Sequence, residues 1–226
     1  MNNKTLQRRD LGRLVLAGAL LFGAAVAFVQ PARAADEAPD ALVKRLSTDV
    51  LETIKSDTSI KSGDVNKIMV LVDSKIMPNV DFARMTAAAV GPAWRQATPE
   101  QRTKLQEEFK ILLVRTYSGA LAQVNDQTIS IKPQRSAPTD TDVVVRSEIR
   151  GRGDPIQLEY RLEKTPGQGA GWKIYNLNVL GVWLVETYRS QFAQEINAKG
   201  VDGLIAALAE RNKTNANASA NAARKG

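Results

Sequence analysis

The segment PIQLEYRLEK (Pro155–Lys164) alternates strictly between apolar and polar side chains from Ile156 to Glu163. A period of two is typical of a β-strand with one face buried and the other in water. The apolar face consists of Ile156, Leu158, Tyr160 and Leu162. It predicts a sheet whose inner face must be covered by other elements of the chain.

Two neighbouring segments share this period and a third is also a predicted strand, so PIQLEYRLEK belongs to a predicted meander. They are residues 128–132, DVVVRSEIR (Asp142–Arg150) and WKIYNLNVL (Trp172–Leu180). The connecting stretches GRGD and PGQGAG supply glycines, which adopt the positive φ angles of tight turns. We therefore expect four antiparallel strands, apolar on one face and charged on the other.

Helical periodicity flanks the predicted sheet on both sides. The helical segments are residues 41–57, 62–77, 82–90, 99–124, 184–197 and 201–211. Asp81 predicts the cap of a short helix, and Thr98 with Gln101 three residues later matches a capping box. Because these helices are the available cover for the apolar face, the expected fold class is α+β, a four-stranded curved antiparallel sheet wrapped by helices.

The first 34 residues have the pattern of a secretory signal peptide. A basic start precedes a 16-residue apolar run, Leu14–Val29, and the small-x-small pattern Ala32-Arg33-Ala34 follows. The run is shorter than the ~20 residues of a membrane-spanning helix, so we predict cleavage after about Ala34 rather than a membrane anchor. Export follows by either the general secretory or the twin-arginine route.

Removing residues 1–34 changes the charge balance. They hold five of the 31 basic and one of the 24 acidic residues, so the remainder has 26 basic residues, 23 acidic residues and a net charge of +3 rather than +7. That charge gives little support to a nucleic-acid surface. We predict one domain over residues 35–211, followed by a disordered tail over residues 212–226, because the tail is low-complexity, small and polar.

The residue types absent from the chain exclude several classes of active site. The chain has no cysteine and no histidine, which excludes thiolate nucleophiles, Ser-His-Asp triads and metal sites built on these ligands. The acidic pairs Glu107–Glu108 and Asp140–Asp142 do not converge on a predicted pocket, so we interpret them as solvated. We expect no enzyme and no cofactor, although a carboxylate or tyrosine mechanism stays open.

Several motifs resemble those of the MlaC family, also called toluene-tolerance proteins. They are IMPNVDFARMTAAAVGPAWRQATPEQRTKLQEEFKILLVRTYSGAL (76–121), WKIYNLNVLGVWLVETYRSQF (172–192) and GVDGLIAALAER (200–211). The resemblance covers about residues 40–211, the whole predicted domain. Trp183 departs from it, since the family more often has a small polar residue at that position.

The resemblance implies a periplasmic phospholipid-binding auxiliary component of an ABC transporter. Such a protein carries glycerophospholipid between an outer-membrane lipoprotein–porin complex and an inner-membrane complex with a ring-shaped lipid-binding component, which maintains the lipid asymmetry of the outer membrane. The cargo lies in a lipid cavity between sheet and helices and requires no catalytic residue. The direction of transport stays open. The alternatives are a periplasmic chaperone for apolar segments and an isomerase-like enzyme.

The expected lining of this cavity combines the inner sheet face with the facing helix stripes. The lipid-binding residues are Phe82, Leu113, Tyr117, Val143, Val145, Leu158, Tyr160 and Tyr188. Arg115 and Arg189 are candidates to approach the phosphate of the headgroup, because guanidinium groups pair well with phosphate oxygens. The alternative for both arginines is a solvated position or an ion pair with an acid.

Overall fold

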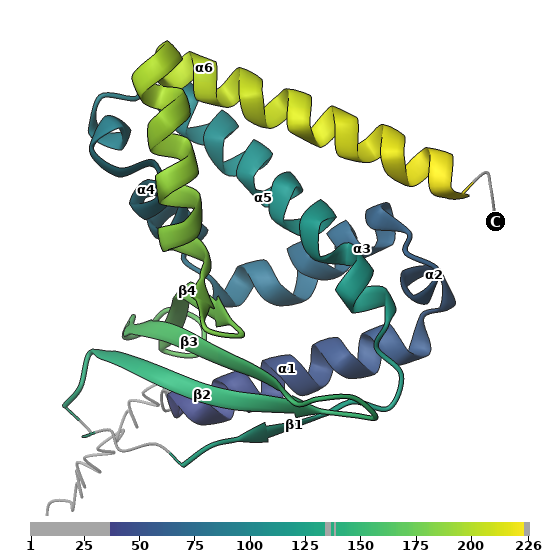
Figure 1. Cartoon of the computed structure of the whole chain (residues 1–226). Coiled ribbons are helices and arrows are strands. Elements are labelled where there is room, and N and C mark those ends of the chain that lie inside the picture. The colour runs from purple at the N-terminus through teal and green to yellow at the C-terminus, as the bar shows by residue number, and fades with distance from the viewer. Residues whose placement is uncertain (1–36, 134–136, 138, 224–226) are drawn as a thin grey trace, which may run out of the picture. The chain divides into compact units, whose positions relative to one another are not determined.

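Among the residues that the computed structural model describes (37–133, 137 and 139–223), five β-strands form one antiparallel sheet (Figure 1). The strands are β1 (Thr128–Ile131), β2 (Asp142–Arg150), β3 (Ile156–Lys164), β4 (Trp172–Val179) and β5 (Val182–Trp183), and they lie in this order across the sheet. The α+β class with an antiparallel sheet is confirmed. The predicted signal peptide and its cleavage site lie outside the described residues.

The prediction of four strands was wrong, because β5 adds a short fifth strand. β5 has two residues and pairs with β4 through Asn178–Trp183 and Val179–Val182. A strand of this length cannot show an alternating period, so the sequence pattern does not reveal it. It turns the end of the sheet directly into the helix that follows.

Helices precede the sheet and follow it. The elements are α1 (Pro39–Ser56), α2 (Thr58–Lys61), α3 (Val65–Leu71), the π-helix η1 (Val72–Ile76), the 3-10 helices η2 (Met77–Asn79) and η3 (Gly91–Arg95), α4 (Phe82–Val90), α5 (Pro99–Ala122) and α6 (Leu184–Ala223). The predicted caps are confirmed. Asp81 accepts a hydrogen bond from the Arg84 N–H at 2.8 Å, and Thr98 and Gln101 form a capping box at the start of α5.

α6 is two helical parts joined at Gly200, whose φ of 70° departs from helical geometry. The N-terminal part of α6 follows directly on β5, and the C-terminal part packs along α5 (Figure 1). Residues 212–223 continue this second part as helix, where the sequence composition had predicted a disordered tail. Alanine is the strongest helix former, and it alternates with asparagine and serine through much of this segment.

The described residues pack into three separate apolar clusters. The helical core joins α4, α5 and α6 and includes Phe109 and Phe192. The sheet core joins α1 to the inner face of β2, β3 and β4 and includes Leu42 and Val145. The connector core joins α1, α2, α3 and α5 and includes Ile68. The three clusters share no buried residue among those described.

Glu148 on the outer face of β2 makes the fold sensitive to acid. Its side chain is surrounded by Gln157, Arg150 and Lys132. The hydrogen bonds from Gln157, then Arg150 and then Lys132, lower the pKa of Glu148 from 4.5 to about 2. Because the folded pKa lies below the unfolded one, the ionised carboxylate stabilises the fold above about pH 4.5. This contribution is lost as the pH falls towards 2.

We expect the variant Glu148→Gln to have a lower urea midpoint of unfolding than the wild type at pH 7. The difference in urea midpoint between the two proteins should narrow as the pH falls from 4.5 to 2, because protonation then removes the charge of Glu148 from the wild type as well. Glu107→Gln, at an exposed position, is the control, and its urea midpoint should differ little from that of the wild type over this whole pH range. If the difference in urea midpoint between Glu148→Gln and the wild type stayed constant over this pH range, the lowered pKa of Glu148 would be contradicted.

Candidate functional site

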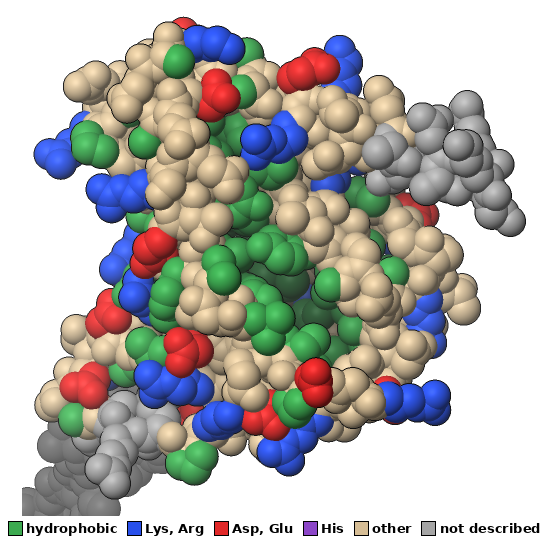
Figure 2. All heavy atoms as spheres, viewed as in Figure 1, with side chains coloured by type: hydrophobic (Ala, Val, Ile, Leu, Met, Phe, Trp, Pro, Cys, Tyr) green, Lys and Arg blue, Asp and Glu red, His purple; other side chains and the backbone are tan. Residues whose placement is uncertain are grey.

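A hollow lined by hydrophobic side chains lies near the middle of the face shown in Figure 2. In the same view of Figure 1, α1, α5 and the β4 end of the sheet surround this place, with α3 behind. These elements belong to three different cores, because α1 and the sheet form the sheet core, α5 joins the helical core, and α3 belongs to the connector core. The hollow therefore lies where the three cores meet.

Four apolar side chains connect the cores without being fully buried in any of them. Val80 and Leu177 pack against both the helical and the sheet core. Val50 packs against the sheet and connector cores, and Met77 against the helical and connector cores. A domain usually has one contiguous core that buries its central apolar side chains. The partial exposure of these four indicates apolar-walled space between the cores.

Sequence reasoning missed these four residues, although one signal for Leu177 exists. Leu177 pairs with Tyr160, so both side chains lie on the inner face, but the register shifts between Arg161 and Leu162. The shift puts Ile174 and Leu177 three positions apart on one face, which breaks the period of two. A break in alternation within WKIYNLNVL was therefore the available sign of a bulge.

The eight predicted lining residues fall into two groups. Leu113, Tyr117 and Leu158 are partly exposed and pack at the margins of the helical and sheet cores. The buried group consists of Phe82 and Tyr188 in the helical core and Val143, Val145 and Tyr160 in the sheet core. The structure thus leaves the first group partly exposed at the margins of the cores and packs the second group inside them.

The predicted lining includes three tyrosines, whose phenol groups are protonated at neutral pH. Burial raises the pKa of Tyr117 and of Tyr188. Burial also raises the pKa of Tyr160, and a hydrogen bond with Ser47 offsets part of this. A general base works best when its pKa lies near the working pH. These tyrosines are therefore available as hydrogen-bond donors rather than as general bases.

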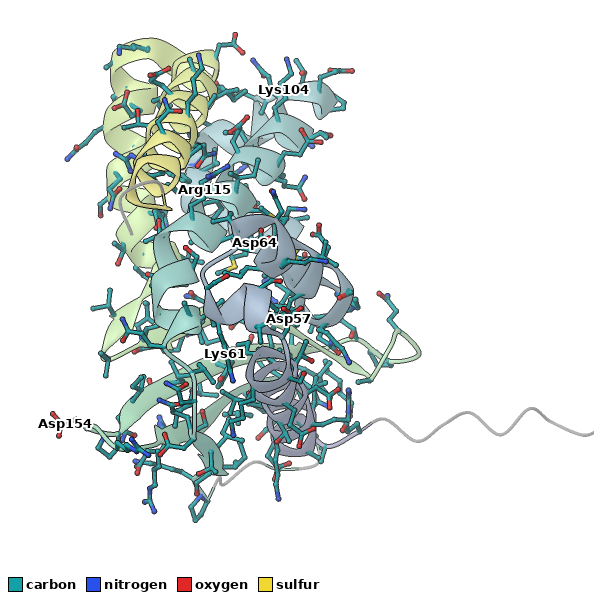
Figure 3. The ribbon with its side chains drawn as sticks, turned by 90° about the vertical axis from the view of Figure 1, so that its right-hand side faces the viewer. Asp57, Lys61, Asp64, Lys104, Arg115 and Asp154 are labelled. Atoms are coloured by element: carbon teal, nitrogen blue, oxygen red, sulfur yellow. The ribbon has the colours of Figure 1, made fainter. Side chains whose placement is uncertain are left out.

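Arg115 lies on the side of α5 that faces away from Tyr117. Two helical residues two positions apart point about 200° from each other around the axis. Glu108 is two turns before Arg115 on the same face, and its carboxylate accepts a 2.7 Å hydrogen bond from Asn212 of α6. In Figure 3, Arg115 lies beside the C-terminal part of α6. Its buried Nε atom has no hydrogen-bond partner.

Arg189 is exposed on the N-terminal part of α6. Its guanidinium Nε atom lies 3.7 Å from the position that a Cβ atom on Gly91 would occupy. Gly91 ends α4, so Arg189 covers the outside of the helical core. The structure therefore places the two candidate headgroup arginines in different surroundings and does not bring them together.

Polar contacts tie the outer face of the sheet to the helices. Arg84 of α4 pairs with Glu163 of β3, and Arg161 of β3 pairs with Glu186 of α6 at 2.8 Å. Asn176 of β4 donates a second 2.8 Å hydrogen bond to Glu186. Burial alone would raise the pKa of Glu186, but these hydrogen bonds outweigh it and lower the pKa. The contacts fix the sheet edge from which α6 starts.

Two further searches of the described residues bear on the kind of site. Within that part of the chain, no group of three or more His, Cys, Asp or Glu side chains is arranged to hold a metal ion. In the same residues, none of the helices combines the length and the apolar character that a membrane span requires.

Comparison with known proteins connects this geometry to one family. The family model described as MlaC protein matches residues 44–210. Toluene tolerance protein ttg2D of Pseudomonas putida is 27% identical over 169 residues, which cover 74% of this chain and 77% of that protein. The intermembrane phospholipid transport system binding protein MlaC of Haemophilus influenzae is 24% identical over 173 residues, 76% of this chain and 80% of that protein.

A solved structure has the same fold at higher identity. It is the phospholipid-binding protein from Ralstonia solanacearum in complex with a phospholipid. It superposes with a TM-score of 0.75 at 50% sequence identity, covering 78% of this chain and 98% of that one. The similarity therefore extends over almost all of a protein of known three-dimensional structure.

Proposed function

The chain belongs to the MlaC family, and from this premise we propose that it is a carrier that binds one glycerophospholipid and moves it through water between membranes. The observation that supports this most directly is the apolar hollow between three separate cores. The phospholipid in the similar Ralstonia structure supports the same ligand class.

The acyl chains would occupy the hollow, with the headgroup towards solvent. Exposing an acyl chain to water costs about 0.8 kcal/mol for each CH₂ group, so a carrier has to shield most of both chains. The partly exposed side chains Leu113, Tyr117 and Leu158 form the proposed walls, together with Val80 and Leu177. The buried members of the predicted lining then support these walls from behind. They are Phe82, Val143, Val145, Tyr160 and Tyr188.

The proposed place of action is the periplasm. The predicted signal peptide (1–34) supports export, and the domain that acts there would be residues 35–211. We propose that it exchanges phospholipid with an inner-membrane ABC transporter complex and with an outer-membrane lipoprotein–porin complex, so that the outer membrane keeps its lipid asymmetry. Family membership supports the proposal of these partners. Shielding a lipid requires apolar surface and no covalent chemistry, so the proposal includes no catalytic residue.

Native mass spectrometry of the purified mature protein tests the binding step. We expect a bound species whose added mass equals one phospholipid with two acyl chains. After removal of this lipid, the protein should take up phospholipid again from vesicles. A protein that stays empty in both measurements would overturn the proposal. If such an empty protein suppressed the aggregation of an unfolded polypeptide, the chaperone alternative would replace it.

A further inference from the structure

The turn between β4 and β5 exposes apolar side chains at one end of the sheet. Leu180 is 63% exposed and Val182 is 50% exposed, and Ile156 at the start of β3 is 39% exposed. These are three of the four large hydrophobic residues that are exposed in the described part of the chain. The N–H of Leu180 donates a hydrogen bond to the carbonyl of Gln157, which places the turn beside the start of β3.

Leu180 is unfavourable in this turn on two counts. Its φ of 52° makes it the one non-glycine residue with positive φ among those described, and Gly181 follows with a φ of 88°. A two-residue hairpin with positive φ at both positions favours Asn-Gly, because the left-handed region crowds the Cβ atom of other residues. An exposed leucine also loses the free energy of apolar burial. A strained and exposed apolar residue points to a contact that the free protein lacks.

The turn is fixed in position rather than free to fold inwards. Asn178 is 5% exposed, and its side-chain oxygen accepts a 2.8 Å hydrogen bond from the N–H of Gly181. Val179 and Val182 pair on either side of the turn. Leu180 is therefore held at the surface by the backbone and by a buried side chain.

The exposed residues continue the inner face of the sheet. Ser147, Leu158 and Val179 pair in sequence across β2, β3 and β4, and Val179 pairs in turn with Val182 of β5. Directly paired side chains lie on the same face. Along this row the exposed fraction of the residue rises from 1% at Ser147 to 50% at Val182. Leu158 and Val179, which lie between them, are partly exposed. The apolar inner face thus runs from the sheet core to the surface at the turn.

The charges beside the turn do not favour an anionic surface. Arg161 lies 4.0 Å over the ring of Trp183, the residue after Val182, and pairs with Glu186 at 2.8 Å. On the neighbouring β2–β3 hairpin, Arg150 pairs with Glu148, and the Arg152 Nε lies 3.4 Å from the Asp126 carboxylate. Asp154 follows in the same hairpin. Because each of these arginines is paired with an acid, none is left to attract an anionic surface, so we take the contact made by Leu180 and Val182 to be with something apolar.

We propose that Leu180 and Val182 form an apolar lip that contacts the acyl chains of the phospholipid as they pass between a membrane and the hollow. This inference rests on the proposed carrier function. In it, the lip increases the rate at which lipid enters and leaves the protein, and it does not affect how well bound lipid is retained. The lip replaces water around the chains during transfer, because it extends the apolar inner face from the sheet core to the surface.

The variant Leu180→Asn tests the lip and introduces the preferred Asn-Gly turn. We expect its transfer of pyrene-labelled phosphatidylglycerol between phosphatidylethanolamine–phosphatidylglycerol vesicles to be about tenfold slower than that of the wild type, since one leucine contact is lost. The bound phospholipid seen by native mass spectrometry should be unchanged. The urea midpoint should stay equal or rise. Val182→Thr should slow transfer in the same direction.

Val70→Gln is the matched control, because Val70 is 64% exposed on α3, away from the turn. It should transfer lipid at the wild-type rate. If the Leu180→Asn protein transfers lipid as fast as the wild type, the proposal that Leu180 and Val182 contact the acyl chains is overturned. That result would point to a protein partner for this surface instead. Equal slowing by Val70→Gln also overturns the proposal. A wild-type protein without bound lipid overturns the carrier function itself, so the two failures are distinguishable.

Discussion

Replacing Phe109 with alanine is expected to lower the free energy of unfolding by about 3–5 kcal/mol. Phe109 is fully buried in the helical core. Its ring stacks on Phe82 with a centroid distance of 5.6 Å, and it meets Tyr188 and Phe192 edge-on at 5.0 and 5.2 Å. Phe82, Phe109 and the other two rings come from α4, α5 and α6, so one truncation opens a cavity among three helices.

Urea denaturation and thermal melting of the Phe109→Ala protein measure this effect. For a domain of this size, a loss of 3–5 kcal/mol corresponds to a fall in melting temperature of roughly 10 °C. Phe109→Leu keeps more of the volume and should lose less stability. Val70→Ala, at an exposed position, should change stability by less than about 0.5 kcal/mol. A loss below 1 kcal/mol for Phe109→Ala would mean that the rings do not form the centre of this core.

Local sequence signals predicted the elements that depend on neighbouring residues. The strict alternation of β3 gave its inner face, and Thr98 with Gln101 gave the start of α5, because periodicity and capping act within a few residues. β5 could not be predicted in this way, since its two residues depend on pairing with β4. The helical continuation after residue 211 was not predicted, because a polar, low-complexity composition is typical of disorder, whereas the alanines of this segment favour helix.

The division of the apolar residues among three cores could not be predicted from periodicity. Val145 and Leu158 both lie on the inner face of the sheet, yet Val145 is fully buried and Leu158 is partly exposed. The difference depends on where α1 lies against the sheet, which a pattern within one strand does not encode. The orientation of Arg115 was predictable, since it follows from its helical position relative to Tyr117.

Replacing Leu113 with glutamate is expected to abolish phospholipid retention while the protein stays folded. Leu113 lies on α5 at the margin of the helical core and is partly exposed, so a carboxylate there can keep some water. Glutamate also has a high helix propensity. In the Leu113→Glu protein, bound acyl chains would displace that water from the glutamate. The charged carboxylate would then lie in an apolar site, which costs several kcal/mol. Native mass spectrometry should therefore show more than a tenfold loss of bound phospholipid, with an unchanged circular dichroism spectrum.

Two further variants separate the wall of the hollow from the packed cores. Leu113→Met conserves volume and apolar character, so it should retain the lipid. Val145→Asp introduces a charge where the side chain is fully buried between α1 and the sheet, so the protein should fail to fold rather than merely release its cargo. If Leu113→Glu kept its phospholipid, the acyl chains would have to lie away from α5, and the wall formed by Leu113 and Tyr117 would be misassigned. Loss of lipid in the folded Leu113→Glu protein, with retention in Leu113→Met, places the chains against α5 because charge alone then distinguishes the two.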